Sequence, residues 1–324
     1  MVDHPGARPG PDAAYAQWLA ACTDAGWLGQ AAAEQVPVQD ALARVTAVPV
    51  RANEVIIPAG HRLRPADLAA AAGHTTLDVA RRPLVAIIPT GDEIRPVGAA
   101  LGPGDLIDTN SLMLALLARD IGACAEVSDV QPDDPGMITA ELRRTAAAAG
   151  LILLIAGSSA GRSDYAATAI AGAGGLAVRG VAVRPGHPAL LGHARPGRAS
   201  PPVPVIGIPG YPLSAAVIFK LFGLPLLATL QGGQPPVPAC QRARLASDWA
   251  SSPDDENWVL VTLAPDSEHP DGTMIATPAG RGAGSISRLM RAHAWWRIPI
   301  GQAKFDPGEL IDVQPIPGAP RAAS

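Results

Sequence analysis

Residues 151–164 read LILLIAGSSAGRSD, and this stretch decides the fold. Its five leading residues, Leu151 to Ile155, are all aliphatic, which predicts a strand buried on both faces, as in a parallel sheet. The Gly, Ser and Ala residues that follow predict a tight loop, and a helix is expected to begin at about Asp164. Because such a loop exposes backbone N–H groups at the positive end of a helix dipole, it favours phosphate or another oxyanion.

The chain around this stretch alternates short apolar runs with helical patterns, which is the order expected of βαβ units. Residues 81–236 are therefore expected to form an α/β domain with a central, mainly parallel sheet and flanking helices. The expected strands are 84–88, 125–130, 151–155, 177–183 and 204–208, and the expected helices are 110–120, 135–150, 164–172 and 213–222. In such sheets ligands bind beyond the carboxyl ends of the strands.

Two further segments flank this domain. Residues 1–80 are expected to form a helical N-terminal segment, with helices over 13–26, 38–45 and 65–73. A Gly/Pro-rich linker at 232–238 precedes residues 237–324, which are expected to form a small C-terminal β domain. Its expected strands are 258–263, 273–277, 295–300 and 310–315.

The composition narrows the class of protein. Hydrophobic residues make up 48% of the 324 residues, and 34 Gly and 34 Pro suit an α/β protein rich in turns. The net charge of −4 gives no indication of a nucleic-acid partner. Cys22, Cys124 and Cys240 lie far apart, which indicates a reducing compartment without a disulfide framework. We find neither a signal-peptide pattern nor an apolar run of membrane-span length, so a cytoplasmic protein without a membrane partner is expected.

Four polar turns follow expected strands, at 89–93, 157–164, 183–188 and 207–214. The first carries the adjacent acids Asp92 and Glu93, whose oxygens suit Mg²⁺. The third carries Arg184, whose guanidinium can clamp a phosphate. Taken alone, the first three turns are better explained as solvated turns or helix caps, and the fourth is explained as well by a rigid strand–helix connection. Together, at one edge of a sheet, they suit a phosphorylated ligand and a divalent metal.

Taken in order, these motifs resemble those of the molybdopterin molybdenumtransferase family, whose eukaryotic counterpart is the gephyrin E domain. The matching stretches are TGDE at 90–93, DTN at 108–110, PDD at 132–134, AGSS at 156–159 with SDY at 163–165, RPGHP at 184–188 and PGYP at 209–212. The resemblance covers roughly residues 53–316, because GSISRL at 284–289 and GELIDV at 308–313 look like the last domain of that family.

The resemblance implies insertion of molybdate into adenylylated molybdopterin with release of AMP, by a Mg²⁺-dependent homodimer. It implies Asp92 and Asp164 as the catalytic acids and the metal ligands. The implied cofactor-binding residues are Thr90, Gly91, Glu93, Asn110, Gly157, Ser158, Ser159, Arg184, Gly186, His187, Pro209, Gly210 and Ser214. Molybdate is a tetrahedral dianion, so hydroxyl, N–H and cationic donors suit it.

The sequence also departs from the family. Arg184 and His187 stand where the family usually has lysines, and Tyr211 stands where it has Asn. A His in place of a Lys removes a fixed charge near neutral pH.

A larger departure lies near the N-terminus. Residues 41–45 resemble the helix that enters an inserted domain of the family, residues 53–63 resemble the return, and only 46–52 lie between them. We therefore expect the inserted domain to be missing, together with part of the substrate pocket and one catalytic carboxylate. A non-catalytic molybdopterin- or molybdate-binding module is the alternative function, and a gephyrin-like scaffold is a third.

Overall fold

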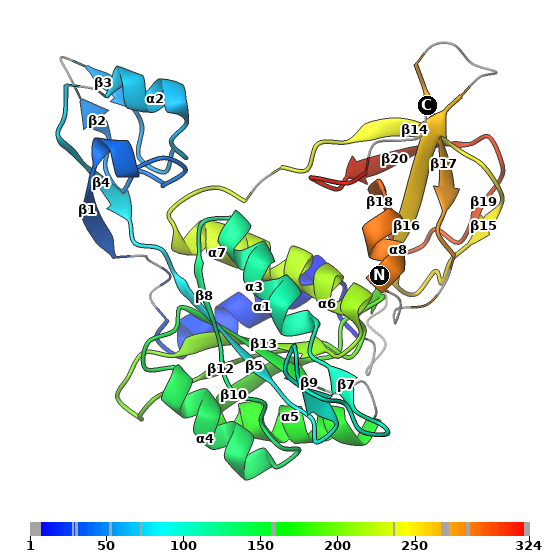
Figure 1. Ribbon diagram of the computed structural model, residues 1–324, viewed down its shortest axis with the longest axis horizontal. Helices are drawn as coiled ribbons and strands as arrows, with labels where there is room; N and C mark the ends of the chain where they lie inside the picture. Colours follow the sequence, from blue (N-terminus) through cyan, green and yellow to red (C-terminus); the bar gives the residue numbers. More distant parts are fainter. Residues whose placement is uncertain are drawn as a thin grey trace.

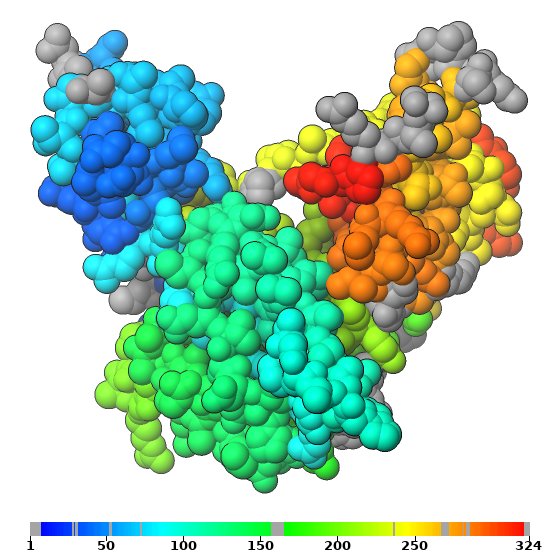
Figure 2. Space-filling view, viewed as in Figure 1, coloured from blue at the N-terminus to red at the C-terminus, as the bar shows by residue number. Residues whose placement is uncertain are grey.

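The computed structural model describes residues 8–27, 29, 32–51, 54–71, 73–156, 160–235, 237–266, 272–280, 282 and 286–320, with the backbone alone for 160–164. These residues form a small N-terminal module, a central α/β body and a C-terminal β lobe (Figure 1). The two smaller parts stand on the same side of the body, and Figure 2 shows a wide notch between them.

The α/β body is built on a six-stranded sheet with the strand order β10-β12-β13-β9-β5-β8. Its strands are β5 (Leu84–Pro89), β8 (Cys124–Val127), β9 (Leu151–Ala156), β10 (Gly174–Arg179), β12 (Leu190–Ala194) and β13 (Val203–Pro209). Strands β13, β9, β5 and β8 run parallel, whereas β12 is antiparallel to both of its neighbours. The predicted mainly parallel sheet is confirmed, but the antiparallel strand β12 was not expected.

Helices cover both faces of this sheet (Figure 1). Helices α4 (Pro135–Thr145) and α5 (Ala160–Ala173) lie on one face. The other face carries α1 (Pro11–Asp24), α3 (Asn110–Asp120) and the continuous helical stretch of α6 (Pro212–Ile218), η2 (Phe219–Gly223) and α7 (Leu224–Leu230). The expectation that no apolar run reaches membrane-span length is wrong for residues 212–230, which by length and composition could cross a membrane. Because this helix is 67% buried and packs in the core of the body, we interpret it as a core helix.

Residues 33–80 form a mixed module instead of the expected run of helices. Its elements are β1 (Ala33–Pro37), η1 (Val38–Asp40), β2 (Val50–Arg51), β3 (Val55–Ile57), α2 (Pro65–Ala70) and β4 (Thr76–Ala80). Strand β1 pairs with β4, and β2 pairs with β3, around a small apolar core of its own. The expected helix over 38–45 is wrong beyond η1, because Ala43 has a φ of 61° and Val45 and Thr46 form β-bridges.

Helix α1 belongs to the α/β body and not to this module. The Trp18 side chain is fully buried, and its Nε1–H donates a hydrogen bond of 2.7 Å to the Gly192 carbonyl of β12. Trp18 also makes edge contacts with Tyr15 and Phe222. The N-terminal 80 residues therefore pack in two places, with α1 against the sheet and residues 33–80 apart from it.

The C-terminal lobe is the small β domain that the sequence predicts, and its sheet closes into a barrel, which was not predicted. Its elements are β14 (Gln241–Leu245), β15 (Trp249–Ala250), β16 (Glu256–Pro265), β17 (Met274–Pro278), α8 (Ile286–Arg291), β18 (Ala294–Ile298), β19 (Lys304–Phe305) and β20 (Leu310–Pro315). Strands β16, β17, β14, β20 and β18 pair in that order, and β18 pairs again with β16, which closes the sheet. Alternate residues of β16 face inward, whereas Trp258 and Leu260 pack against the α/β body.

Two further parallel pairings involve short strands. Strands β6 (Ile94–Arg95) and β7 (Leu106–Ile107) flank an excursion that precedes α3. Strand β11 (Val183–Arg184) leaves the α/β body and pairs in parallel with β16 of the barrel. The expected strand over 177–183 is therefore split between two sheets, because its last part joins the other lobe.

Candidate ligand-binding site

The loops that carry the candidate residues leave the central sheet at one edge. A single row of paired residues crosses the sheet, from Arg179 through Leu190, Gly207 and Leu154 to Ile88. The loops after β5, β9 and β13, and the connection from β10 to β12, all begin a few residues beyond this row. Strand register thus brings four separate parts of the sequence to the same edge.

The Thr90–Glu93 turn is fixed by the two neighbouring strand ends. The Thr90 backbone N–H and Oγ1 both donate to the Ile155 carbonyl, at 3.0 and 2.9 Å. Gly91 has a φ of 132°, and a Cβ there would lie 2.8 Å from the Ile94 side chain, so the turn requires glycine. Asp92 is exposed, and its Oδ1 accepts a long hydrogen bond of 3.4 Å from the Asp133 N–H.

Asn110 links α3 to the turn after β13. Its Nδ2 donates a hydrogen bond of 2.7 Å to the Gly210 carbonyl, and the residue is buried. Its Oδ1 is buried and has no hydrogen-bond partner among the described residues. Ser214, at the start of α6, is also buried. Asn110 is therefore tied to the turn that leads from β13 to Ser214.

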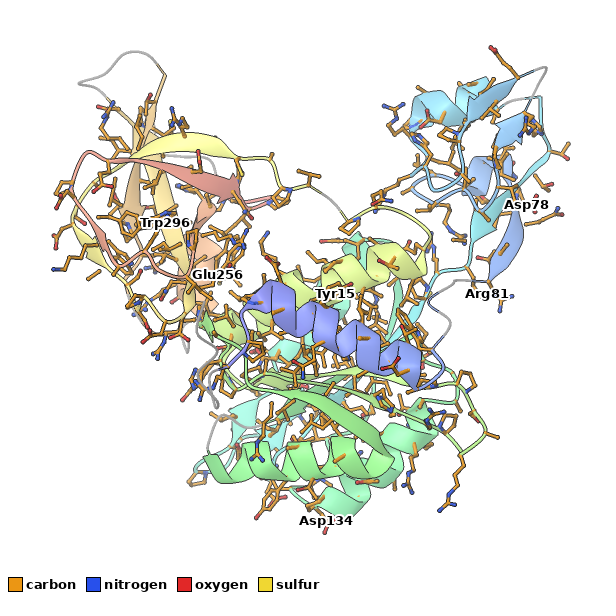
Figure 3. All side chains as sticks on the ribbon, turned by 180° about the vertical axis from the view of Figure 1, so that it is seen from behind. Tyr15, Asp78, Arg81, Asp134, Glu256 and Trp296 are labelled. Carbon is orange, nitrogen blue, oxygen red and sulfur yellow. The ribbon has the colours of Figure 1, made fainter. Side chains whose placement is uncertain are left out.

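A cavity of about 420 Å³ lies where the α/β body meets the C-terminal lobe. From the body it is lined by the candidate residues Arg184, Gly186, His187, Pro209 and Ser214. Tyr211 and Leu213 also line it from the body, and residues 249–252, 257–260, 280, 282 and 288 line it from the C-terminal lobe. Figure 3 labels Glu256 close to this junction and Trp296 farther out in the lobe.

An ion pair crosses the junction at this cavity. The Arg184 Nε–H donates to Asp255 Oδ2, and Asp255 is buried while the Arg184 side chain is 56% exposed. The pKa of His187 is held below its usual value by burial and by the positive charges of Arg8 and Arg184, although Asp255 acts in the opposite direction. A lowered pKa makes His187 neutral at pH 7.

Sequence reasoning missed the part of the cavity that the barrel contributes. Asn257 Nδ2 donates to the carbonyls of Ser252 and Asp255, at 3.0 and 2.8 Å, which holds the 252–257 turn in place. The Trp258 Nε1–H donates to Glu256 Oε1 at 2.7 Å. The run SSPDDEN at 251–257 is recognisable as a polar turn, but nothing in its spacing indicates that it meets Arg184.

Several expected site residues stand apart from this cavity or outside the described residues. Among the residues that the structure describes, Thr90–Glu93 and Asn110 do not line the cavity but lie farther along the same sheet edge. Gly157, Ser158 and Ser159 lie outside the described residues, and only the backbone of Asp164 is described, at the start of α5. The meeting of Asp92 with Asp164 therefore stays a prediction.

An α/β sheet with its candidate loops at the carboxyl edge, joined through a shared cavity to a closed barrel, defines a two-lobed ligand-binding protein. Residues 86–229 match the family described as "Probable molybdopterin binding domain", and residues 242–316 match the "MoeA C-terminal region (domain IV)". The two matches meet at the cavity.

Similar whole proteins carry related names. The chain is 28% identical over 283 residues to the molybdopterin molybdenumtransferase of Nostoc sp., covering 85% of this chain and 63% of that protein. It is 32% identical over 235 residues to molybdopterin molybdenumtransferase 2 of Mycobacterium tuberculosis, covering 70% and 56%. The solved structure of the molybdopterin biosynthesis MoeA protein from Pyrococcus horikoshii has a TM-score of 0.78 at 20% identity, covering 94% of this chain and 98% of that chain.

The chain belongs to the molybdopterin molybdenumtransferase (MoeA) family. It spans 63% and 56% of the length of the Nostoc and Mycobacterium relatives.

Proposed function

We propose that the protein acts in molybdenum cofactor biosynthesis, as a transferase that inserts molybdate into adenylylated molybdopterin with release of AMP. The cavity of about 420 Å³ carries this proposal, because both regions that match the family wall it. Trp258, Val259 and Leu260 supply an apolar wall, while Arg184 and Ser214 supply donors. Such a site suits a ligand with a flat ring system and an anionic group.

The sheet edge also has room for an extended substrate. Strands β13, β9 and β5 are neighbours, and adjacent strands lie about 4.8 Å apart, so the loops after β13 and β5 begin about 10 Å apart. We assign the pterin, with its anionic group, to the cavity. We assign the adenylyl phosphate to the other end of the sheet edge, which carries Asp92 and is called the Asp92 end. Ser158 and Ser159 would donate hydrogen bonds to the oxyanion between them.

Mg²⁺ fits the donor chemistry at the Asp92 end. The Asp92 carboxylate is exposed, and no group of three His, Cys, Asp or Glu side chains suited to a metal occurs among the described residues. Mg²⁺ is commonly held by one or two carboxylates together with substrate phosphates, and the exposed Asp92 carboxylate can serve as one of them. We propose that Asp92 and Asp164 hold the ion, which supplies positive charge against the phosphate oxygens.

The N-terminal module supports a second function. Val50 pairs with Ile57 across the β2–β3 hairpin, and both residues are buried in the core of the module. The chain therefore closes a compact unit where the family carries its inserted domain. Because that domain is implied to supply one catalytic carboxylate, a non-catalytic molybdopterin- or molybdate-binding module is the alternative.

We further propose a cytoplasmic homodimer with a small-molecule pterin substrate, without a nucleic-acid or membrane partner. The division at 80/81 and 236/237 into an N-terminal segment, a molybdopterin-binding domain and a C-terminal domain is part of the same proposal. The separate cores of the module and the barrel support these boundaries, whereas the packing of α1 on the sheet departs from them.

An AMP-release assay separates the two functions. With adenylylated molybdopterin, molybdate and Mg²⁺, we expect the protein to release AMP, and Asp92→Ala to slow release roughly 100-fold. Asp120→Ala is the matched control, because Asp120 is exposed and ends α3 at the opposite edge of the sheet. Tight pterin binding without AMP would support the binding module, and the absence of both would contradict both functions.

Calorimetry tests the metal separately from turnover. Binding of adenylylated molybdopterin is expected to weaken when EDTA is added, because Mg²⁺ offsets the repulsion between Asp92 and the phosphates. In Asp92→Ala the effect of EDTA should largely disappear. If the unmodified protein binds the ligand equally well with and without EDTA, Mg²⁺ does not take part in binding at this site.

A further inference from the structure

The backbone places Asp255 beside Arg184 independently of their side chains. Val183 pairs with Glu256 and Arg184 with Asn257 in the parallel β11–β16 ladder. The Glu256 N–H also donates to the Ala182 carbonyl at 2.9 Å. Strand pairing therefore fixes the Asp255 carboxylate beside Arg184, which itself lines the cavity.

The contact uses only part of the Arg184 guanidinium. Asp255 Oδ2 accepts from Arg184 Nε and, at 3.1 Å, from Ser252 Oγ. A guanidinium has five N–H donors, so an Nε contact leaves its two NH₂ groups for another acceptor. Because the Arg184 side chain is 56% exposed and lines the cavity, an anionic ligand can reach those groups.

Among the residues that the structure describes, Arg184, His187 and Arg288 line the cavity, and Arg8, Arg184 and Asp255 act on His187. Since the pKa of His187 lies below its usual value, this side chain is neutral at pH 7. At that pH, Asp255 opposes the positive charge of Arg184.

We propose that Asp255 is a specificity-determining residue that competes with the anionic group of the ligand for Arg184, and so sets how tightly and at what pH the cavity binds a tetrahedral oxyanion. The inference rests on the proposed function, because it takes this cavity as the binding site of the anionic group. Competition is favoured over positioning because strand pairing already fixes the Arg184 backbone, while the buried carboxylate repels any ligand of the same sign.

Calorimetry on the full chain at low ionic strength tests the competition. The probe is inorganic sulfate, which stands in for the anionic group of the ligand and stays a dianion from pH 7.5 to 5.5. We expect Asp255→Asn to bind sulfate about tenfold more tightly at pH 7.5, and Asp255→Glu to bind it like the unmodified protein. Asp254→Asn is the matched control, because Asp254 lies on the same turn but is exposed, whereas the carboxylate that contacts Arg184 is that of Asp255. This change should alter affinity less than about twofold.

The pH dependence of sulfate binding separates an electrostatic role of Asp255 from a purely structural one, because a structural role would leave that dependence unchanged. Sulfate binding should strengthen on acidification as His187 gains its charge, and His187→Gln should abolish that rise. Because Asp255 raises the pKa of His187, Asp255→Asn should shift the rise to lower pH. Asp255→Ser serves as a second neutral variant if the Asn variant unfolds early in a denaturant titration.

Weaker or unchanged binding by folded Asp255→Asn and Asp255→Ser would overturn the inference. So would a tighter binding that persists in an Arg184→Gln background, because the competition acts through Arg184. If the unmodified protein does not bind sulfate, the proposed function of the cavity fails and the inference falls with it. If it binds sulfate but neutral variants at Asp255 have no effect, only the inference fails.

Discussion

Cys22 shows how burial changes the chemistry of a single side chain. It lies on the inner face of α1, is fully buried, and burial raises its pKa to about 12. Cys124 and Cys240 are exposed. Because the thiolate is the reactive form, a disulfide reagent at pH 8 should modify Cys124 and Cys240 in the folded protein and Cys22 only after unfolding. Rapid modification of all three thiols would contradict the packing of α1 against the sheet. In the Cys22→Ser variant, the thiol that reacts only after unfolding should be absent.

At this scale the sequence predicts residues inside one turn better than residues joined across the fold. Asp92, Arg184 and Ser214 were found because each stands in a short polar motif after an apolar run. Asp255 was missed because it lies 71 residues from Arg184. Their contact depends on β11 leaving one sheet for another, which no local pattern encodes.

Among the elements, α1 offers a direct test of packing. Trp18 fills the space between α1, β12 and Phe222, and its Nε1–H satisfies the Gly192 carbonyl. Trp18→Ala should therefore lower the free energy of unfolding by about 3–5 kcal/mol, measured by denaturant titration. Gln17→Ala, on the exposed side of the same helix, should cost less than about 1 kcal/mol. Equal losses for the two variants would show that α1 does not depend on this buried face.

Elements with one strong pattern were predicted well, and elements set by pairing were not. The strands at 84–88, 151–155 and 204–208 are almost continuous apolar runs, and the structure has them as β5, β9 and β13. Strand β12 was missed because LLGHA is short and contains Gly and His, and it becomes a strand by pairing on both sides. The apolar spacing of 38–45 suggested a helix, but β-bridges to Arg62 and Val79 hold Val45 and Thr46 in extended pairing.

For the whole molecule, the three parts are joined in different ways. The barrel is held to the α/β body by the β11–β16 ladder, by the Arg184–Asp255 ion pair and by the packing of Trp258 and Trp295. The N-terminal module instead touches the body by close backbone approach, since a Cβ on Gly60 would lie 2.7 Å from the Gly232 carbonyl oxygen. The linker at 232–238 was predictable from its composition. The cavity was not, because two lobes distant in sequence build it.

The outer face of α3 is where we expect a second copy of the chain to bind. Leu112 and Leu116 are 51% and 50% exposed, although Leu114 and Ala118 on the same helix are buried in the core. A helix that is apolar on all sides is normally covered on all sides, and the family resemblance implies a homodimer. Light scattering should therefore give a dimer for the unmodified protein and a monomer for Leu112→Glu/Leu116→Glu.

The control for this test is Val237→Glu/Met290→Glu, which changes two exposed apolar residues of the C-terminal third, 92% and 68% exposed. Because a charge buried in an interface costs far more than one left in water, only the α3 pair should dissociate the dimer. An unmodified protein that is monomeric at micromolar concentration would contradict the homodimer. A dimer that survives both leucine changes would move the interface away from α3, and the exposed Leu42, Val48 and Val55 of the N-terminal module would then be the next residues to change.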